Sequence, residues 1–206
     1  RIGDVLSYDY RFAQNLRTWH PYQDINDFYV SDPGTGAGRE MAAFELSWLT
    51  WLFGIDYDVL GASVDKLSEI SIETKIDDFY SFIIRHTKKN IVGNTTIDVF
   101  SHKPYRVLRI AGTDGNVEFD WIKNKVDLFN SDGTLVSTYS EEDTSVEEGY
   151  TQFSTEKMYV EEIKNFISSV NNPQIAKCKI DDDFKVLSCV KKIERLKSSI
   201  LVSILI

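Results

Sequence analysis

Apolar residues recur with a helical period along residues 41–53, directly after the glycine-rich stretch 34–38. At 100° per residue, five large apolar side chains fall on one face of this segment: Met41, Phe44, Trp48, Trp51 and Leu52. The spacing therefore predicts a helix that ends at Gly54 and packs this face into a core. Glu45 falls inside the same apolar face, and Glu40 lies at its edge in the first turn.

Beyond this helix the period changes from 3.6 to 2, which is typical of strands. Residues 70–76 alternate apolar and polar side chains in this way, within a longer strand-rich region, 55–140. The pairs Asp114-Gly115 and Asp132-Gly133 stand between strand-like segments, and Asp-Gly is a strong hairpin signal. Because hairpins join antiparallel strands, residues 55–140 are predicted to form a meandering sheet.

Two amphipathic helices are predicted near the end of the chain. The first covers residues 159–170 and stops at Asn171-Asn172-Pro173; the second covers residues 184–196, behind an acidic run that suits the positive end of a helix dipole. Sheet and helices together predict an α+β fold, a mostly antiparallel open sheet with helices packed on one face. We expect a single domain over residues 1–206.

The composition narrows the range of partners. A net charge of −9 over 206 residues argues against a nucleic-acid partner, because affinity for phosphate backbones comes from clustered Lys and Arg. No apolar run reaches transmembrane length and no signal peptide opens the chain, so we expect no membrane partner and a cytoplasmic location. Cys178 and Cys189 are too few for a disulfide framework. Because Arg1 stands in place of Met, we expect a piece of a longer protein, or a numbering that starts inside one.

Glu45 is the first candidate for chemistry. A carboxylate among apolar neighbours must find a partner, hold a proton or face a cavity, because an unpaired buried charge is too costly. The structural alternative is a buried pair with an arginine such as Arg11, Arg39 or Arg109. Glu40 also has a simple structural role, since a carboxylate in the first turn stabilises a helix.

A polar and aromatic connection, residues 15–33, supplies the second group of candidates. So many polar-tipped aromatic residues predict a packed loop that takes part in function. His20 is the best placed of three histidines for proton transfer, whereas His86 and His102 stand near turns and are expected at the surface.

Other motifs are excluded by their spacing. Residues 34–38 do not make a dinucleotide fingerprint, because Arg39 stands where the third glycine belongs and Asp32-Pro33 precedes the loop in place of a buried strand. No spacing of His, Cys, Asp and Glu resembles a metal site, and no serine elbow or Cys–His signature is present. We therefore expect no metal ligands and no cofactor-binding residues in this chain.

The order of these segments resembles the C-terminal domain of the Gfo/Idh/MocA family of NAD(P)-dependent oxidoreductases. Residues 1–5 resemble the strand that opens that domain, residues 34–54 resemble its central helix with the Gly-rich loop before it, and residues 166–196 resemble its closing helix pair. The resemblance implies that an N-terminal Rossmann domain is missing here, together with the family's lysine in a Glu-Lys-Pro segment. It further implies NAD or NADP in the intact protein, none bound by this chain alone, and a homo-oligomer formed through the sheet.

The resemblance also implies a site. The family's central helix usually carries an Asp and, four residues on, a His for substrate binding and proton transfer; here those positions are Glu40 and Phe44. Phe44 cannot move a proton, so Glu45, His20 or the missing lysine would replace the base. The expected catalytic residues are His20 and Glu45. The expected substrate-binding residues are Glu40, Arg39, Tyr22 and Trp19.

The function expected from this resemblance is the substrate-binding and oligomerisation half of a nicotinamide-dependent oxidoreductase. Its small-molecule substrate would be a sugar, nucleotide sugar or polyol. The alternative is a non-catalytic domain whose sheet serves only for dimerisation or interaction.

Overall fold

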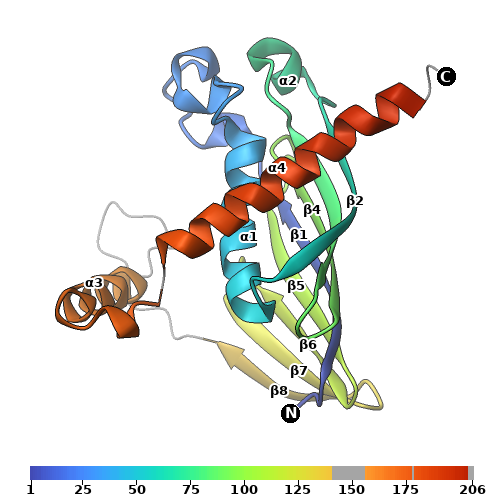
Figure 1. Ribbon diagram of the computed structural model, residues 1–206, viewed down its shortest axis with the longest axis vertical. Coiled ribbons are helices and arrows are strands. Elements are labelled where there is room, and N and C mark those ends of the chain that lie inside the picture. Colours follow the sequence, from blue (N-terminus) through green and yellow to red (C-terminus); the bar gives the residue numbers. More distant parts are fainter. Residues whose placement is uncertain (141–155, 178, 204–206) are drawn as a thin grey trace.

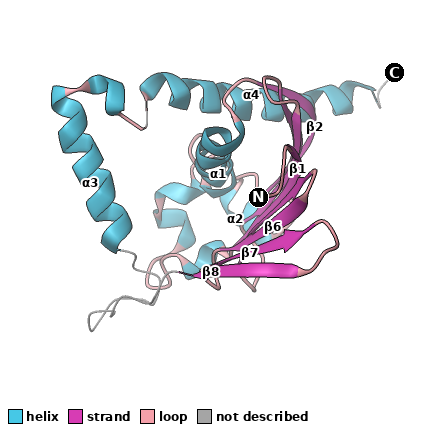
Figure 2. Cartoon of the chain, turned by 90° about the horizontal axis from the view of Figure 1, so that it is seen from below, coloured by secondary structure: helices cyan, strands magenta, loops and turns pink. Residues whose placement is uncertain are grey.

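An eight-stranded sheet forms the frame of the protein in a computed structural model that describes residues 1–140, 156–177 and 179–203. The strands are β1 (Val5–Ala13), β2 (Tyr57–Asp65), β3 (Phe79–His86), β4 (Ile91–Asp98), β5 (Tyr105–Gly112), β6 (Gly115–Asp120), β7 (Lys125–Asn130) and β8 (Leu135–Ser140). The α-helices are α1 (Ala37–Phe53), α2 (Glu69–Thr74), α3 (Glu156–Asn171) and α4 (Ile180–Ser203). Helices α1 and α4 cover one face of the curved sheet (Figures 1 and 2), which confirms the α+β prediction.

The predicted meander is wrong at one point, because the first strand is inserted into it. The strand order is β2-β3-β4-β1-β5-β6-β7-β8, and β1 pairs parallel with β4 while every other neighbouring pair is antiparallel. Three consecutive inward side chains of β1, those of Tyr8, Tyr10 and Phe12, are buried, as a central strand requires. The hairpins predicted at Asp114-Gly115 and Asp132-Gly133 are confirmed as the β5–β6 and β7–β8 connections.

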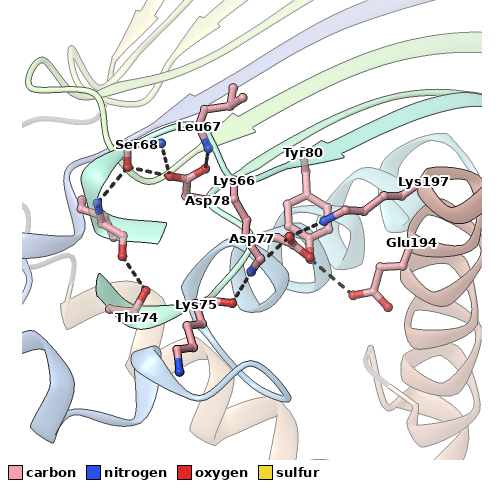
Figure 3. Close-up of polar contacts among 11 residues, drawn as sticks. Lys66, Leu67, Ser68, Thr74, Lys75, Asp77, Asp78, Tyr80, Glu194 and Lys197 are labelled. Carbon is pink, nitrogen blue, oxygen red and sulfur yellow. Dashed lines mark hydrogen bonds and ion pairs between the residues drawn. The ribbon is translucent and has the colours of Figure 1, made fainter. Parts of the chain in front are cut away.

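The segment that alternates at residues 70–76 forms the short helix α2, not a strand. Ile70 and Thr74 lie one helical turn apart and are both buried, and the Thr74 hydroxyl donates to the Ile70 carbonyl at 2.7 Å. The buried Asp78 carboxylate accepts hydrogen bonds from the Leu67 and Ser68 amides at 2.8 and 2.9 Å, just before the helix (Figure 3). These local bonds override a weak alternation pattern.

The buried side of α1 also differs from the prediction. Its core-facing residues are Ala42, Leu46, Leu49 and Phe53, with Glu45 among them. Phe44 and Trp51, which the helical spacing predicts on the core face, are 57% and 72% exposed. The helix is apolar around most of its circumference, so polarity alone does not decide which side faces the sheet.

Helix α4 crosses α1 and packs against it and the sheet through apolar and charged contacts. Val186, Cys189, Val190 and Ile193 are buried, within the part of α4 whose side chains the structure describes. Glu194 forms an ion pair with Arg39 of α1 at 2.9 Å. Glu194 also accepts from the Tyr80 hydroxyl at 3.3 Å, and Lys197 binds the Asp77 carboxylate at 2.5 Å (Figure 3). Helix α1 is therefore held between the sheet on one side and α4 on the other.

Helix α3 stands apart from the sheet in both views (Figures 1 and 2). Its apolar stripe is exposed, with Ile163 at 59% and Phe166 at 69%. Its contact with the segment after it includes the Asn165 side-chain amide, which donates to the Ile175 carbonyl at 3.2 Å. The two closing helices are present as predicted, but only α4 buries an apolar face in the described part of the chain.

Two titratable side chains, those of His86 and Cys189, are buried. His86 is buried, not at the surface: its Nδ1 lies 2.6 Å from the Gly54 carbonyl and its Nε2 lies 3.1 Å from the Tyr8 hydroxyl. Burial lowers the pKa of His86, so the imidazole remains neutral and structural. Cys189 is a free buried thiol whose pKa burial raises to about 12, and Cys178 lies outside the described residues.

Candidate functional site

The exposed side of α1 carries a stripe of four residues at helical spacing, Glu40, Phe44, Ser47 and Trp51. Glu40 is half-buried in the first turn of the helix, and the other three follow at intervals of three or four residues. Because the opposite side of α1 packs on the sheet, this stripe is the part of the helix that a ligand or a partner can reach.

Glu40 is held by a tyrosine that the sequence did not single out. The Tyr29 hydroxyl donates to Glu40 Oε1 at 2.9 Å. Partial burial and the neighbouring Glu40 carboxylate raise the pKa of Tyr29, so this hydroxyl acts as a donor and keeps its proton. Glu40 Oε2 is buried and accepts no hydrogen bond within the described chain. One carboxylate oxygen of Glu40 is therefore held by Tyr29, and the other is buried with its acceptor position unfilled by any described residue.

Ring and hydrogen-bond contacts within the aromatic connection, residues 15–33, extend from His20 to the Glu40 carboxylate. His20 Nδ1 lies 2.6 Å from the Tyr22 hydroxyl, and the imidazole centroid lies 4.1 Å from that of Phe28. Phe28 in turn contacts Tyr29, with ring centroids 4.6 Å apart. The structure thus links the predicted residues His20 and Tyr22, through Phe28 and Tyr29, to Glu40.

This connection is packed, as predicted. Three short 3-10 helices, Leu16–Thr18, Ile25–Asp27 and Tyr29–Ser31, form it, and a second apolar cluster around Leu16, Ile25 and Val30 supports it. Trp19 packs against this cluster, and its indole N–H is buried without a hydrogen-bond acceptor among the described residues.

Glu45 has a different environment from Glu40. It is fully buried, and its Oε2 accepts from the Tyr10 hydroxyl at 2.5 Å and from the Trp48 indole N–H at 2.6 Å. Burial and the nearby Glu45 charge raise the pKa of Tyr10, so Tyr10 remains a donor. The Arg106 guanidinium completes the group, with its Nη2 3.2 Å from Glu45 Oε1.

The arginine that pairs with Glu45 is therefore Arg106, not Arg11, Arg39 or Arg109. Arg106 lies on β5 two residues before the buried Leu108, and residues two apart point to the same face of a strand. The sequence therefore held a sign of this pairing, because the charged Arg106 lies on the same face of β5 as the buried Leu108.

Arg106 also contacts the exposed stripe of α1. Its guanidinium lies 4.1 Å from the centroid of the Trp121 ring and 5.6 Å from that of Phe44. A cation this close to an aromatic face is attracted by the ring electrons. Glu45 is thus buried beneath a guanidinium whose other neighbours are two aromatic rings.

Arg39 does not join the other candidates. Besides its ion pair with Glu194, it donates from Nη1 to the Gly34 carbonyl at 2.6 Å, which directs the side chain toward α4 and the preceding loop. A series of contacts through Phe28 and Tyr29 connects His20 and Tyr22 with Glu40, whereas Arg39 and Glu45 make separate contacts.

The glycine-rich loop does not fit a dinucleotide. A Cβ on Gly36 would meet the Val30 carbonyl, and a Cβ on Gly38 would meet the Asp77 carbonyl, so these glycines serve close packing within the protein. A phosphate-binding glycine leaves the same space open for the ligand backbone. Across the described residues, no group of three or more His, Cys, Asp and Glu gathers as metal ligands.

Two depressions of the described surface lie away from these residues. One, of about 490 Å³, is lined by the β5–β6 and β7–β8 turns, including Thr113, Asn116 and Asp132. None of the candidate residues borders it. In the described ranges, none of the helices is both long enough and apolar enough to cross a membrane.

Comparison with known proteins identifies the family of this chain. The family model described as the GFO/IDH/MocA C-terminal domain matches residues 1–118. No curated protein matches the chain.

Solved structures share the fold over 96% of the chain. They include UDP-N-acetylglucosamine 3-dehydrogenase from Acidithiobacillus ferrooxidans (13% identity, TM-score 0.65, 55% of that chain covered). A levoglucosan dehydrogenase in complex with NADH and levoglucosan matches at 15% identity and TM-score 0.70, with 58% of that chain covered. An NAD binding oxidoreductase from Klebsiella pneumoniae matches at 13% identity and TM-score 0.74, also with 58% covered.

The chain thus spans little more than half the length of these proteins. The family model covers more than half of the chain, and the solved structures agree with it in fold. The protein belongs to the GFO/IDH/MocA family and carries its C-terminal domain.

Proposed function

We propose that this chain is the substrate-binding half of a nicotinamide-dependent oxidoreductase, and that Glu40 binds a hydroxyl group of the substrate. The observation that carries the proposal is the state of Glu40 on the side of α1 that faces away from the sheet: Tyr29 donates to one carboxylate oxygen, and the other is buried without a donor among the described residues. A ligand O–H group that entered beside Oε2 would supply the donor that this buried oxygen lacks.

His20 is the proposed proton-transfer residue. Phe44 occupies the position one turn after Glu40 and has no exchangeable proton, so the base must come from elsewhere. The imidazole of His20 is hydrogen-bonded to Tyr22 and connected by ring contacts to Tyr29, which binds Glu40. Imidazole is the group that most often transfers protons in enzymes.

The proposed substrate is a sugar, nucleotide sugar or polyol. Two proteins that share the fold carry the names of a nucleotide-sugar dehydrogenase and a levoglucosan dehydrogenase. NAD or NADP would supply hydride transfer in the intact protein from a separate domain, because the space beside Gly36 and Gly38 is filled by the protein's own backbone. A cytoplasmic location and a homo-oligomer formed through the sheet remain part of the proposal.

A non-catalytic interaction domain is the second candidate function. The contact that favours it is the buried pair between Glu45 and Arg106, since the carboxylate that first suggested a site is satisfied inside the protein. In that case Glu40 would be a helix-terminal charge and no sugar would bind near it.

Saturation-transfer NMR on this chain separates the two candidates. We expect signals from levoglucosan or another member of a panel of neutral sugars and polyols, and we expect Glu40→Ala to abolish them. Ser47→Ala is the matched control, because Ser47 is exposed on the same stripe and its hydroxyl donates to the Ala43 carbonyl of its own helix, at 3.0 Å. Equal signals from wild type and Glu40→Ala would remove Glu40 from the site.

A further inference from the structure

The charge of Arg106 is balanced from inside the protein. Glu45 is fully buried, and both of its oxygens lie within 3.3 Å of Arg106 Nη2. Tyr10 and Trp48 fix the carboxylate by donating to its Oε2, so it cannot turn away from the guanidinium. The pair therefore carries no net charge toward the surface.

The outer side of the pair is aromatic. The Arg106 side chain is 17% exposed and contacts the rings of Trp121 and Phe44, and the Trp121 amide donates to the Arg106 carbonyl at 2.9 Å. Arg106 Nε is buried and has no acceptor in the part of the chain that the structure describes. Phe44 follows Glu40 by one turn, so this cluster borders the proposed hydroxyl-binding position.

We propose that Glu45 is a positioning residue that cancels the charge of Arg106 and so makes this surface select neutral sugar rings over anionic ones. The inference rests on the proposed function and narrows its substrate class. An isolated arginine beside a sugar site would attract carboxylates and phosphates. With Glu45 directly behind it, an approaching anion meets a negative charge as well as a positive one, and the two effects oppose each other. Aromatic faces and a neutralised guanidinium suit the apolar and hydroxyl edges of an uncharged ring.

The test compares D-glucose with D-glucuronate, which differ in charge at one carbon. Glu45→Gln keeps an oxygen for Tyr10 and Trp48 but leaves Arg106 without a counter-charge. We expect the ratio of glucuronate to glucose affinity, measured by saturation-transfer titration, to rise at least about tenfold over wild type. The double variant Glu45→Gln/Arg106→Met, in which both charges are gone, should keep the wild-type ratio within about twofold.

A measurement without sugar separates this inference from the proposed function. Iodide quenches tryptophan fluorescence and is attracted by an uncompensated cation, whereas acrylamide is neutral. Glu45→Gln should raise quenching by iodide relative to acrylamide, and the added Trp121→Phe replacement should remove most of the increase. Iodide attraction without binding of either sugar would support the charge balance and contradict the sugar site.

Two outcomes would overturn the inference. The first is a folded Glu45→Gln protein, by circular dichroism, with unchanged sugar ratio and unchanged iodide quenching. The second applies if Glu45→Gln does not fold: a double variant that loses glucuronate binding relative to glucose would show that Arg106 already attracts anions in the wild type. An unchanged ratio in the double variant would support the charge balance.

Discussion

Replacing Arg106 by methionine should lower the free energy of unfolding by about 3–5 kcal/mol, because it leaves the Glu45 carboxylate buried without its counter-charge. Glu45 is 0% exposed, so water cannot replace the lost partner. The neutral hydrogen bonds from Tyr10 and Trp48 remain but do not balance a full charge. Denaturation by urea, followed by circular dichroism, measures the loss.

The matched control is the double variant Glu45→Gln/Arg106→Met. Removing both charges leaves no unpaired ion, and Gln keeps an acceptor for Tyr10 and Trp48, so most of the lost stability should return. If the double variant were as unstable as Arg106→Met alone, the loss would come from packing of the arginine stem and not from the buried charge.

Gly93→Ala should cost about 3 kcal/mol, toward the upper end of what overpacking a core costs. Gly93 on β4 lies directly opposite Tyr8 on β1, and a Cβ there would overlap the phenol ring. Tyr8 cannot move aside easily, since it is buried, stacked on Phe53 with centroids 4.2 Å apart and hydrogen-bonded to His86. The thermal midpoint and the urea midpoint should both fall.

Gly61→Ala is the control for this prediction. Gly61 also lies in a strand, β2, but nothing stands within 4 Å of where its Cβ would be. Its replacement should change stability by less than about 1 kcal/mol and can even stabilise, since Ala restricts the unfolded chain. Equal losses at the two positions would mean that a backbone effect, and not the contact with Tyr8, decides the cost.

Much of the fold could be predicted from local patterns. The Asp-Gly turns at residues 114–115 and 132–133 fixed the partners of the last four strands, because a tight turn leaves an antiparallel neighbour as the only choice. The insertion of β1 between β4 and β5 could not be predicted in this way. Alternation shows which face of a strand is apolar, but it does not say which distant strand lies alongside.

The candidate site could also be predicted only as far as local patterns reach. A carboxylate in an apolar stripe predicts a buried partner, and that partner is Arg106, which lies 61 positions away from Glu45 on another element. The loop before α1 was correctly expected to be packed, whereas Tyr29 was missed because several aromatic residues there look alike in sequence. The side of α1 that faces outward became clear only from its packing on the sheet.

Hydride transfer in a polypeptide that joins this chain to a nicotinamide-binding domain tests the central claim most directly. With the sugar that gives the strongest NMR signal, the account predicts that Glu40→Ala lowers kcat/KM by about ten- to a hundredfold, the effect of losing one hydrogen bond to a charged group. Ser47→Ala should leave it unchanged. A Glu40→Ala protein that turns over the sugar as fast as wild type would contradict the account.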